Sequence, residues 1–456
     1  MQSRRIIQVE EKVPLLQGIP LAFQHLFAMF GASVLVPYLF NSWAGAQVID
    51  PSLVLLMNGI GTLIYLFLCK GRAPAFLGSS FAFLSPVAAV LASGGDAKAN
   101  FAKALGGFII SGLVFVLVAL LIGAVGTKWL DIVLPPATMG PIVALIGLEL
   151  AGVAAGNAGL LPKTQLQIID GVATSVALPL DGKAILVSLA TLAVLVLGNL
   201  VFRGFLAIIP ILIAVVFGYV LSATMGMVVW EPVATARFLT FPSFTLPKFD
   251  ISAIIIILPA ALVVISEHIG HLFVTSKIVG RDLTKDPGLH RSLLGDGLST
   301  MLSGFTGSVP TTTYGENMGV MAITGVYSVW VIGGAALISI LMAFFGNVSA
   351  FISSIPGPVM GGITLLLFGV IAASGIRMIV EAKVDYSKSR NLILTALTFV
   401  AGLSGVAVKI GTVELKGMAL ATVFGMAMSL LFFALDKLGL TNDHDNGTAA
   451  TAEKAA

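Results

Sequence analysis

The sequence predicts an all-α polytopic membrane protein with fourteen transmembrane segments, and three observations support this fold class. Of the 456 residues, 57% are hydrophobic and 10% are charged, whereas a soluble protein carries roughly 25% charged residues. Apolar segments of spanning length recur along the whole chain. Two of them, one in each half, are interrupted at corresponding places. We therefore expect two repeats of seven segments each.

The segments are identified by length, since a helix needs roughly 20 mostly apolar residues to cross a hydrocarbon core about 30 Å thick. In the first half they lie near residues 17–40, 52–69, 73–93, 104–125, 135–154, 184–202 and 204–222. In the second half they lie near 251–275, 291–307, 309–324, 327–346, 353–375, 391–408 and 415–435. The third and tenth segments are short and broken, so each is expected to form a short strand followed by a half-helix.

Lysine and arginine predict the orientation, because they concentrate on the cytoplasmic side of membrane proteins. With both termini inside, about two thirds of the 25 lysines and arginines fall on the cytoplasmic side. Removing either interrupted segment would place the basic stretch 276–291 or 374–390 outside. The polar residues 439–456 are expected to be a disordered cytoplasmic tail.

The two halves also share a local sequence pattern. PPATMGPIVAL (135–145) and PGPVMGGITLL (356–366) repeat Pro, Met, Gly, Ile and Leu at the same offset. Since seven is an odd number, two such repeats would have opposite orientations, as is typical of secondary carriers with paired broken helices. We expect the first inverted repeat over residues 1–225 and the second over 250–438.

Two glutamates lie in unfavourable places for a membrane protein. Glu267 lies midway along the apolar run ILPAALVVISEHIGHLFV, and Glu316 follows the extended stretch SVPTTTYG. Ionisable groups at membrane depth are costly and mark substrate or proton paths, and broken helices form binding sites near the bilayer midplane. The pair indicates a transporter. A structural pair between helices for Glu267, and a simple helix cap for Glu316, are the alternatives.

The motif Glu267-His268-Ile269-Gly270-His271 indicates proton chemistry. Glu267 and His271 are four residues apart and share a helix face, whereas His268 projects about 100° away from Glu267. Buried Glu and His side chains form proton relays in carriers, which favours protons over sodium. A zinc site is a weaker alternative, because the order differs from H-E-x-x-H and no third ligand is evident nearby.

The remaining polar positions have open interpretations. Gln24 and His25 in the first segment either brace a site or make a structural contact between helices. Asp296 has the same two interpretations, and Glu149 is interpreted as structural. Gly315 permits close backbone approach, and the helix that follows it would begin with free amide donors. The stretch from Pro74 to Phe83 is the corresponding break in the first half.

Several classes are excluded by missing motifs. The single cysteine, Cys69, excludes an internal disulfide framework and any CxxC motif. No Walker A or Rossmann glycine fingerprint is present, so direct ATP drive is not expected. We expect no cofactor, no metal and no nucleic-acid partner. The expected partners are protons and membrane lipid.

Six blocks of this sequence resemble the nucleobase–ascorbate transporter family, and most closely its bacterial uracil:proton symporters. They are QHLFAMFGASVLVP, AFLGSSFAFLSPV, PPATMGPIVALIGLELAGVAAG, ISEHIGHL, DPGLHRSLLGDGLST and TTTYGENMGVMAIT. The resemblance runs from about residue 10 to 438. It implies a core domain (segments 1–4 and 8–11), a gate domain (segments 5–7 and 12–14), a membrane homodimer and elevator-like alternating access.

The resemblance also implies a set of substrate contacts. Glu267 and Glu316 would hydrogen-bond a pyrimidine, and the backbone amides of Phe81 and Gly315 would meet its carbonyl oxygens. The remaining expected roles are pocket lining by Tyr314 and Ala32, gate-side closure by Phe368, proton coupling by His271 with Glu267, and support by Gln24, His25 and Asn317. Close uracil carriers are expected to have arginine at the position of Gly325.

The resulting hypothesis is import of uracil with protons across the bacterial cytoplasmic membrane, by a non-enzymatic carrier with both termini inside. Uracil has two N–H donors that suit carboxylates, and two carbonyls that suit helix-start amides. A proton symporter for a purine such as xanthine or uric acid is the nearest alternative. An anion carrier and an intramembrane enzyme are more distant alternatives.

Overall fold

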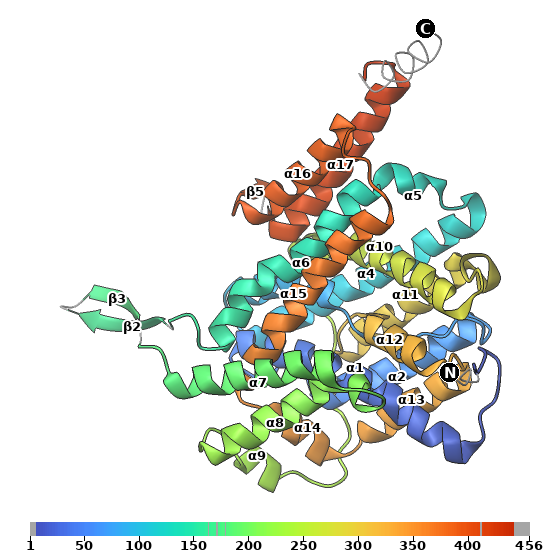
Figure 1. Cartoon of the computed structure of the whole chain (residues 1–456). Coiled ribbons are helices and arrows are strands. Elements are labelled where there is room, and N and C mark those ends of the chain that lie inside the picture. The colour runs from blue at the N-terminus through green and yellow to red at the C-terminus, as the bar shows by residue number, and fades with distance from the viewer. Residues whose placement is uncertain (1–5, 163, 170–171, 178, 411–412, 442–456) are drawn as a thin grey trace.

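The computed structural model describes residues 6–162, 164–169, 172–177, 179–410 and 413–441. These residues are predominantly helical, and the helices pack side by side in one body (Figure 1). Most of the predicted tail, residues 442–456, lies outside the described residues.

The first half of the chain, to residue 250, contains nine α-helices among the described residues: α1 (Leu15–Ala44), α2 (Pro51–Leu68), α3 (Leu84–Leu91), α4 (Ala97–Val125), α5 (Lys128–Val133), α6 (Pro136–Asn157), α7 (Gly182–Val201), α8 (Pro210–Thr224) and α9 (Glu231–Ala234). The second half contains α10 (Ile251–Val279), α11 (Leu289–Thr306), α12 (Gly315–Thr324), α13 (Val329–Met342), α14 (Gly346–Ser353), α15 (Gly357–Glu381), α16 (Ser389–Leu403) and α17 (Gly417–Lys437). Three short turns, η1 (Phe81–Phe83), η2 (Leu206–Ile208) and η3 (Thr284–Gly288), connect them.

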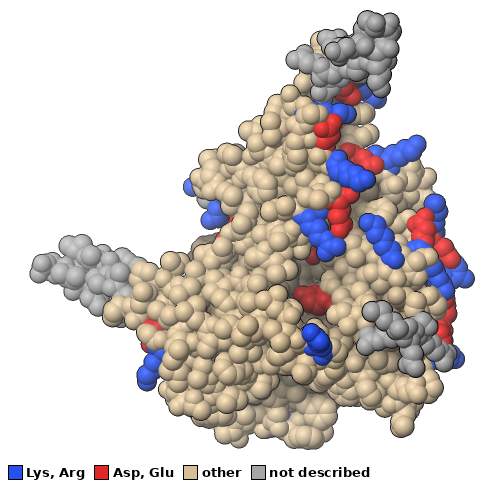
Figure 2. All heavy atoms as spheres, in the orientation of Figure 1, with Lys and Arg blue, Asp and Glu red and all other residues tan. Residues whose placement is uncertain are grey.

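The helices identify a multi-pass membrane protein. Eight helices in the described part of the chain are long and apolar enough to cross a membrane: α1, α2, α4, α6, α7, α10, α15 and α17. Shorter apolar helices are α8, α13, α16 and the η1–α3 segment. Figure 2 shows charged side chains gathered along one edge of the visible face, from α17 toward the N-terminal end, while most of this face is uncharged.

Aspartates begin four of the long helices. Asp50, Asp96, Asp181 and Asp250 each accept a hydrogen bond from a backbone amide in the first turn of α2, α4, α7 and α10. Such N-caps satisfy amides that have no partner within the helix, and each stabilises its helix by about 1 kcal/mol.

A two-stranded antiparallel ribbon lies at the centre of the site. Strands β1 (Leu77–Ser79) and β4 (Thr311–Thr313) pair with Gly78 opposite Thr312. Proline and β-branched threonines favour the extended backbone of β4. The half-helix segment η1–α3 follows β1, and the half-helix α12 follows β4. The third and tenth segments are therefore strand-plus-half-helix elements in the structure.

Helix packing divides most of the chain into two groups. In one, α4 and α10 pack with α11, and α2 packs with α11 and α13, which also contacts α1. In the other, α6 packs with α15, α16 and α17, and α7 packs with α8 and α15. Helix α12 contacts α1 and α10 and so belongs to the first group. The site described below lies where α1 and α12 face α7, α8 and α15 of the second group.

Several predicted boundaries differ from the structure. The segment predicted at 204–222 begins its helix only at Pro210, because η2 precedes it. The segment predicted at 391–408 ends its helix at Leu403, and Gly405 adopts a left-handed φ of 73° just beyond. Two hairpins were not predicted by the all-α interpretation: β2 (Thr164–Ile169) with β3 (Val172–Ala177), and β5 (Ala407–Ile410) with β6 (Val413–Lys416). The β2–β3 hairpin projects from the helical body (Figure 1).

Candidate functional site

The central ribbon joins the starts of two half-helices. Tyr314 donates its backbone N–H to Phe76 O at 3.0 Å, and Ser80 donates to Pro310 O at 2.8 Å, so hydrogen bonds continue beyond both strands. The Tyr314 ring lies on Gly78, where an added Cβ would come within 2.3 Å of the ring. Only glycine permits this approach. The first amides of η1–α3 and α12 have no partners within their own helices and carry the positive end of the helix dipole.

Helix α10 brings His271 against this ribbon. His271 Nδ1 lies 3.0 Å from Thr313 Oγ1. A Cβ built on Gly315 would lie 3.9 Å from His271 Nε2, so the other ring nitrogen faces the start of α12. A hydrogen bond at one ring nitrogen orients the imidazole and sets which nitrogen carries the proton. Thr313 therefore orients the His271 imidazole beside the half-helix.

The two glutamates singled out in the sequence lie on two elements that contact each other, α10 and α12. Glu267 lies on α10 one turn before His271, and Glu316 is the second residue of α12. Both side chains are half-buried, and they lie close enough for their charges to interact. Two carboxylates thus lie on contacting elements, in the region where α12 begins with free amides. This arrangement offers hydrogen-bond acceptors and donors to one small polar molecule.

A cavity of about 380 Å³ gives access to Glu316, and we call it the vestibule. Its walls are mostly apolar side chains of α1, α7, η2–α8, α12 and α15, with Asn199 as a polar group on α7. This size suits a small organic ligand. Figure 2 shows a hollow in the visible face with an acidic side chain inside it.

The supporting residues attach α12 to α1. Asn317 Nδ2 donates to His25 O at 2.9 Å and lies 3.1 Å from His25 Nδ1. Both residues are buried. Gln24, next to His25, has a buried Oε1 without a hydrogen-bond partner among the described residues. His25 and Asn317 therefore hold the half-helix that carries Glu316 in place.

Three expected pocket residues are buried in this state. Ala32, Tyr314 and Phe368 are exposed by 0%, 4% and 1%, and none of them lines the vestibule. The Tyr314 hydroxyl instead donates to Ser79 O at 3.0 Å. Phe81, at the start of η1, is half-buried.

A buried polar network next to the site was missed from the sequence. His268 Nδ1 lies 3.0 Å from Asp296 Oδ2, and His268 Nε2 lies 2.7 Å from Ser292 Oγ. The Tyr65 hydroxyl lies 2.9 Å from the same Ser292 Oγ. The available signal was the spacing of Ser292 and Asp296, which are four residues apart and share a face of α11.

Comparison with known proteins identifies relatives along almost the whole chain. The model of the permease family matches residues 16–411. The chain is 56% identical to the uracil permease of Paenibacillus larvae, covering 96% of this chain and 99% of that protein. It is 58% identical to the uracil permease of Escherichia coli K12 over 94% of each chain, and 42% identical to that of Bacillus caldolyticus over 94% and 95%.

Solved structures share the fold at low sequence identity. The transmembrane domain of the cyanobacterial bicarbonate transporter BicA aligns with a TM-score of 0.57 and 16% identity, over 93% of this chain and all of that one. The murine anion transporter Slc26a9, in its inward-facing state, aligns with a TM-score of 0.68 and 11% identity, over 94% and 69%. These likenesses concern the fold alone.

Proposed function

The chain belongs to the permease family, and from this membership we propose that it is a secondary active transporter that imports uracil together with protons. Its relatives at 56–58% identity are named uracil permeases and match over nearly their full length. The protein is thus a carrier and not an enzyme, and its substrate is uracil.

The mechanism is supported by the packing of α10, which carries Glu267, against the half-helix α12, which carries Glu316 in its first turn. Uracil is a planar ring with two N–H donors and two carbonyl acceptors. The carboxylates accept from the N–H groups, and the amides of Phe81 and Gly315 donate to the carbonyls. A site that must satisfy these hydrogen bonds rejects analogues that leave its buried groups unpaired.

The remaining contacts form around the ring when the carrier closes. Ala32 and Tyr314 line the pocket on the core side, and Phe368 closes it from α15. Their burial in the present state means that they reach the substrate only after the two helix groups shift against each other. Gln24, His25 and Asn317 support the half-helix that carries Glu316.

Proton coupling is assigned to Glu267 and His271. They lie one helical turn apart on α10, and the Thr313 hydroxyl orients the His271 ring. A proton that binds Glu267 removes its charge and changes which hydrogen bonds it can make to uracil. Binding of the proton and of the substrate are thereby linked at one side chain.

The architecture proposed for this activity has fourteen spans in two inverted repeats of seven, over residues 1–225 and 250–438. The two groups of packed helices support a core domain that carries the substrate site and a gate domain, which move against each other as an elevator. The protein acts as a homodimer in the bacterial inner membrane, with both termini in the cytoplasm. On this orientation the vestibule opens to the cytoplasm, because its lining includes residues near the end of α7, the start of α8 and the end of α12.

Uptake of radiolabelled uracil into proteoliposomes tests the proposal. An inward proton gradient should drive accumulation, and a proton uncoupler should abolish it. Unlabelled uracil should compete, while xanthine and uric acid should not. Accumulation that ignores the uncoupler would overturn proton coupling, and stronger competition by xanthine or uric acid would make the protein a purine carrier. Substrate recovered after uptake should be chemically unchanged.

A further inference from the structure

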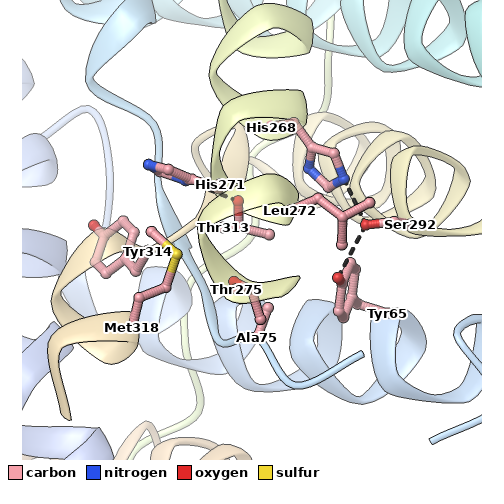
Figure 3. Close-up of a pocket in the computed structure, with 10 residues that line it drawn as sticks. All are labelled: Tyr65, Ala75, His268, His271, Leu272, Thr275, Ser292, Thr313, Tyr314 and Met318. Atoms are coloured by element: carbon pink, nitrogen blue, oxygen red, sulfur yellow. Dashed lines mark hydrogen bonds between the residues drawn. The ribbon is translucent and has the colours of Figure 1, made fainter. Parts of the chain in front are cut away.

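A second and much smaller cavity, of about 10 Å³, lies beside the substrate site. It lies between α2, α10, α11 and the segment that joins β4 to α12. Its polar lining comes from Tyr65, His268, His271, Thr275, Ser292 and Thr313. In Figure 3, His271 and Thr313 lie on one side of this space and His268, Ser292 and Tyr65 on the other. The cavity thus separates the proposed coupling residue from the buried network.

The size and chemistry of this cavity suit one water molecule. A water needs about 10–15 Å³ of accessible space and two to four polar partners. Thr275 is only 3% exposed and lines the cavity. A hydroxyl enclosed in so small a space is best satisfied by a hydrogen bond, which a water in the cavity would provide.

The same water would close a gap in a chain of exchangeable groups. On one side, His271 Nδ1 lies 3.0 Å from Thr313 Oγ1. On the other, Ser292 Oγ lies 2.7 Å from His268 Nε2, and His268 Nδ1 lies 3.0 Å from Asp296 Oδ2. No direct hydrogen bond joins Thr313 to Ser292 in the described part of the chain. One water in contact with both hydroxyls would make the chain continuous.

The Asp296–His268–Ser292 arrangement has the connectivity of a hydrolase triad, in which the histidine activates the serine. Here all three side chains are fully buried, and Ser292 Oγ is also bonded to the Tyr65 hydroxyl. The adjacent space of about 10 Å³ admits a water but no acyl substrate. The geometry therefore favours movement of a proton over attack on a carbonyl.

We propose that this cavity holds a water molecule through which a proton passes between His271 and the His268–Asp296 pair. The inference rests on the proposed proton coupling. The Thr313 hydroxyl accepts a proton from His271 Nδ1 and gives its own to the water. The water passes a proton to Ser292, which passes its own to His268 Nε2. His268 keeps its Nδ1–H on Asp296, and the resulting imidazolium is paired with that carboxylate.

The titratable groups around this path come from four elements. Helix α10 carries Glu267, His268 and His271, and α11 carries Asp296. Helix α2 contributes Tyr65 and Cys69, and the start of α12 contributes Tyr314 and Glu316. The Asp296 carboxylate directly pairs with His268. The proposed path therefore connects two groups of titratable side chains. One is Glu267 and His271 at the substrate site, and the other is the His268–Asp296 pair on the other side of the cavity.

Thr275→Val tests the path, because valine keeps the side-chain shape and removes the hydroxyl that faces the water. Initial rates of proton-driven uracil uptake should fall by about tenfold or more, since a positioned proton-transfer group contributes roughly 10²–10⁴-fold. Exchange of labelled for unlabelled uracil, which needs no net proton movement, should stay within about twofold. Thr275→Ser should restore uptake. Thr422→Val, on buried Thr422 of α17, is the matched control and should change neither rate.

Three outcomes would overturn the inference: wild-type uptake by Thr275→Val, equal loss of uptake and exchange with uracil binding intact, or density showing a dry cavity in the wild-type protein. If Thr275→Val does not fold, the density in the cavity of the wild-type protein decides whether the proposed water is present. Failure of the proposed function has a different signature, because the wild-type protein itself would then accumulate uracil in the presence of an uncoupler.

Discussion

At the scale of single residues, the two glutamates have different surroundings and hence different expected roles. Glu267 lies inside a long helix next to His271 and within reach of the charge of Asp296. Glu316 lies in the first turn of a half-helix, at the positive end of its dipole, and lines the vestibule. An acid among other acids suits proton exchange, whereas a carboxylate at a helix start suits a fixed hydrogen-bond acceptor.

Glu267→Gln is expected to abolish accumulation driven by a proton gradient, because glutamine keeps the shape but cannot exchange a proton. Exchange of uracil across the membrane should persist at a measurable rate. Proteoliposome uptake under an imposed gradient measures both. Glu381→Gln is the control, since Glu381 is on the exposed surface of α15 and pairs with the exposed Arg377. Accumulation at the wild-type level by Glu267→Gln would refute the role given to Glu267.

Glu316→Ala is expected to weaken uracil binding by at least about tenfold, because a hydrogen bond to a charged group contributes roughly 1.5–3 kcal/mol. Isothermal titration calorimetry on purified protein measures the change. Glu381→Ala should bind like the wild type. A dissociation constant for Glu316→Ala within twofold of the wild-type value would remove Glu316 from the substrate site.

The sequence singled out some residues of the proposed site and not others. Glu267, Glu316 and His271 were proposed because charged or titratable groups inside apolar or broken helices have few structural uses. The network of Asp296, His268 and Ser292 was not identified, because it depends on α10 lying beside α11. His268 was predicted to project about 100° away from Glu267, and in the structure its two ring nitrogens lie within hydrogen-bond distance of Asp296 and Ser292 on the neighbouring α11.

At the scale of elements, close helix packing depends on glycine at particular places. Helices α6 and α15 cross so closely that a Cβ on Gly147 would come within 2.0 Å of Phe368 O. Gly375 on α15 faces α6 in the same way, with the Ala144 backbone nitrogen 2.3 Å from a built Cβ. The backbone of Phe368, the proposed gate residue, is thus positioned by a glycine on the neighbouring helix.

Gly147→Ala should lower the free energy of unfolding by about 1–3 kcal/mol, because the added methyl group forces the two helices apart. Thermal unfolding of purified protein measures this as a lower Tm. Gly152→Ala on the same helix is the matched control, since nothing lies within 4 Å of a Cβ there. Alanine favours the helix over glycine, so the control should be unchanged or slightly stabilised. Equal Tm values for the two variants would contradict the close crossing.

The elements themselves were only partly predictable. The two interrupted segments were evident, because a Pro/Thr-rich stretch and a run of small residues around Gly78 are poor helix formers. The β5–β6 hairpin was not evident, because Val406, Val408 and Ile410 continue the apolar character of α16. The left-handed Gly405 ends that helix, and a single glycine in an apolar run does not reveal its conformation.

At the scale of the whole molecule, residues 6–13 at the N-terminus, which we call the strap, are hydrogen-bonded to the proposed cytoplasmic side. Ile7 donates its N–H to Gly325 O at 2.9 Å, and Val329 donates to Val9 O at 2.9 Å. Gly325 ends α12 with a φ of 69°, a conformation that glycine favours and arginine does not. Glycine at this position, in place of the arginine expected in close uracil carriers, therefore fits the way the strap meets the end of α12.

An ion pair fastens this strap to the end of α10. Arg281 Nη1 lies 2.7 and 2.8 Å from the two carboxylate oxygens of Glu10, and this hydrogen bond lowers the pKa of Glu10 below its ordinary value of 4.5. Because the pKa of the paired Glu10 is lowered, the ion pair contributes its full stabilisation of the strap above pH 4.5. The contribution is lost as the pH falls through the pKa of the paired Glu10.

Arg281→Gln should therefore loosen residues 6–13 at neutral pH. It should also remove the loss of strap stability that the wild-type protein shows as Glu10 is protonated in acid. Amide hydrogen exchange of the strap should rise by up to about fivefold, because exposed ion pairs contribute at most about 1 kcal/mol. Lys285→Gln, which removes the exposed pair with Asp282, is the control. Identical exchange of residues 6–13 in wild type and Arg281→Gln would show that the backbone bonds alone hold the strap.

The ribbon between β1 and β4 has a consequence for energy conversion. The starts of the two half-helices are joined by the antiparallel pairing of β1 with β4, two backbone segments that hydrogen-bond to each other. On the proposed elevator mechanism the site therefore moves as one unit, and its intrinsic affinity for uracil is the same on both sides of the membrane. A site with equal affinity on both sides cannot accumulate uracil by itself, so on this proposal the concentration ratio comes from the coupled proton gradient.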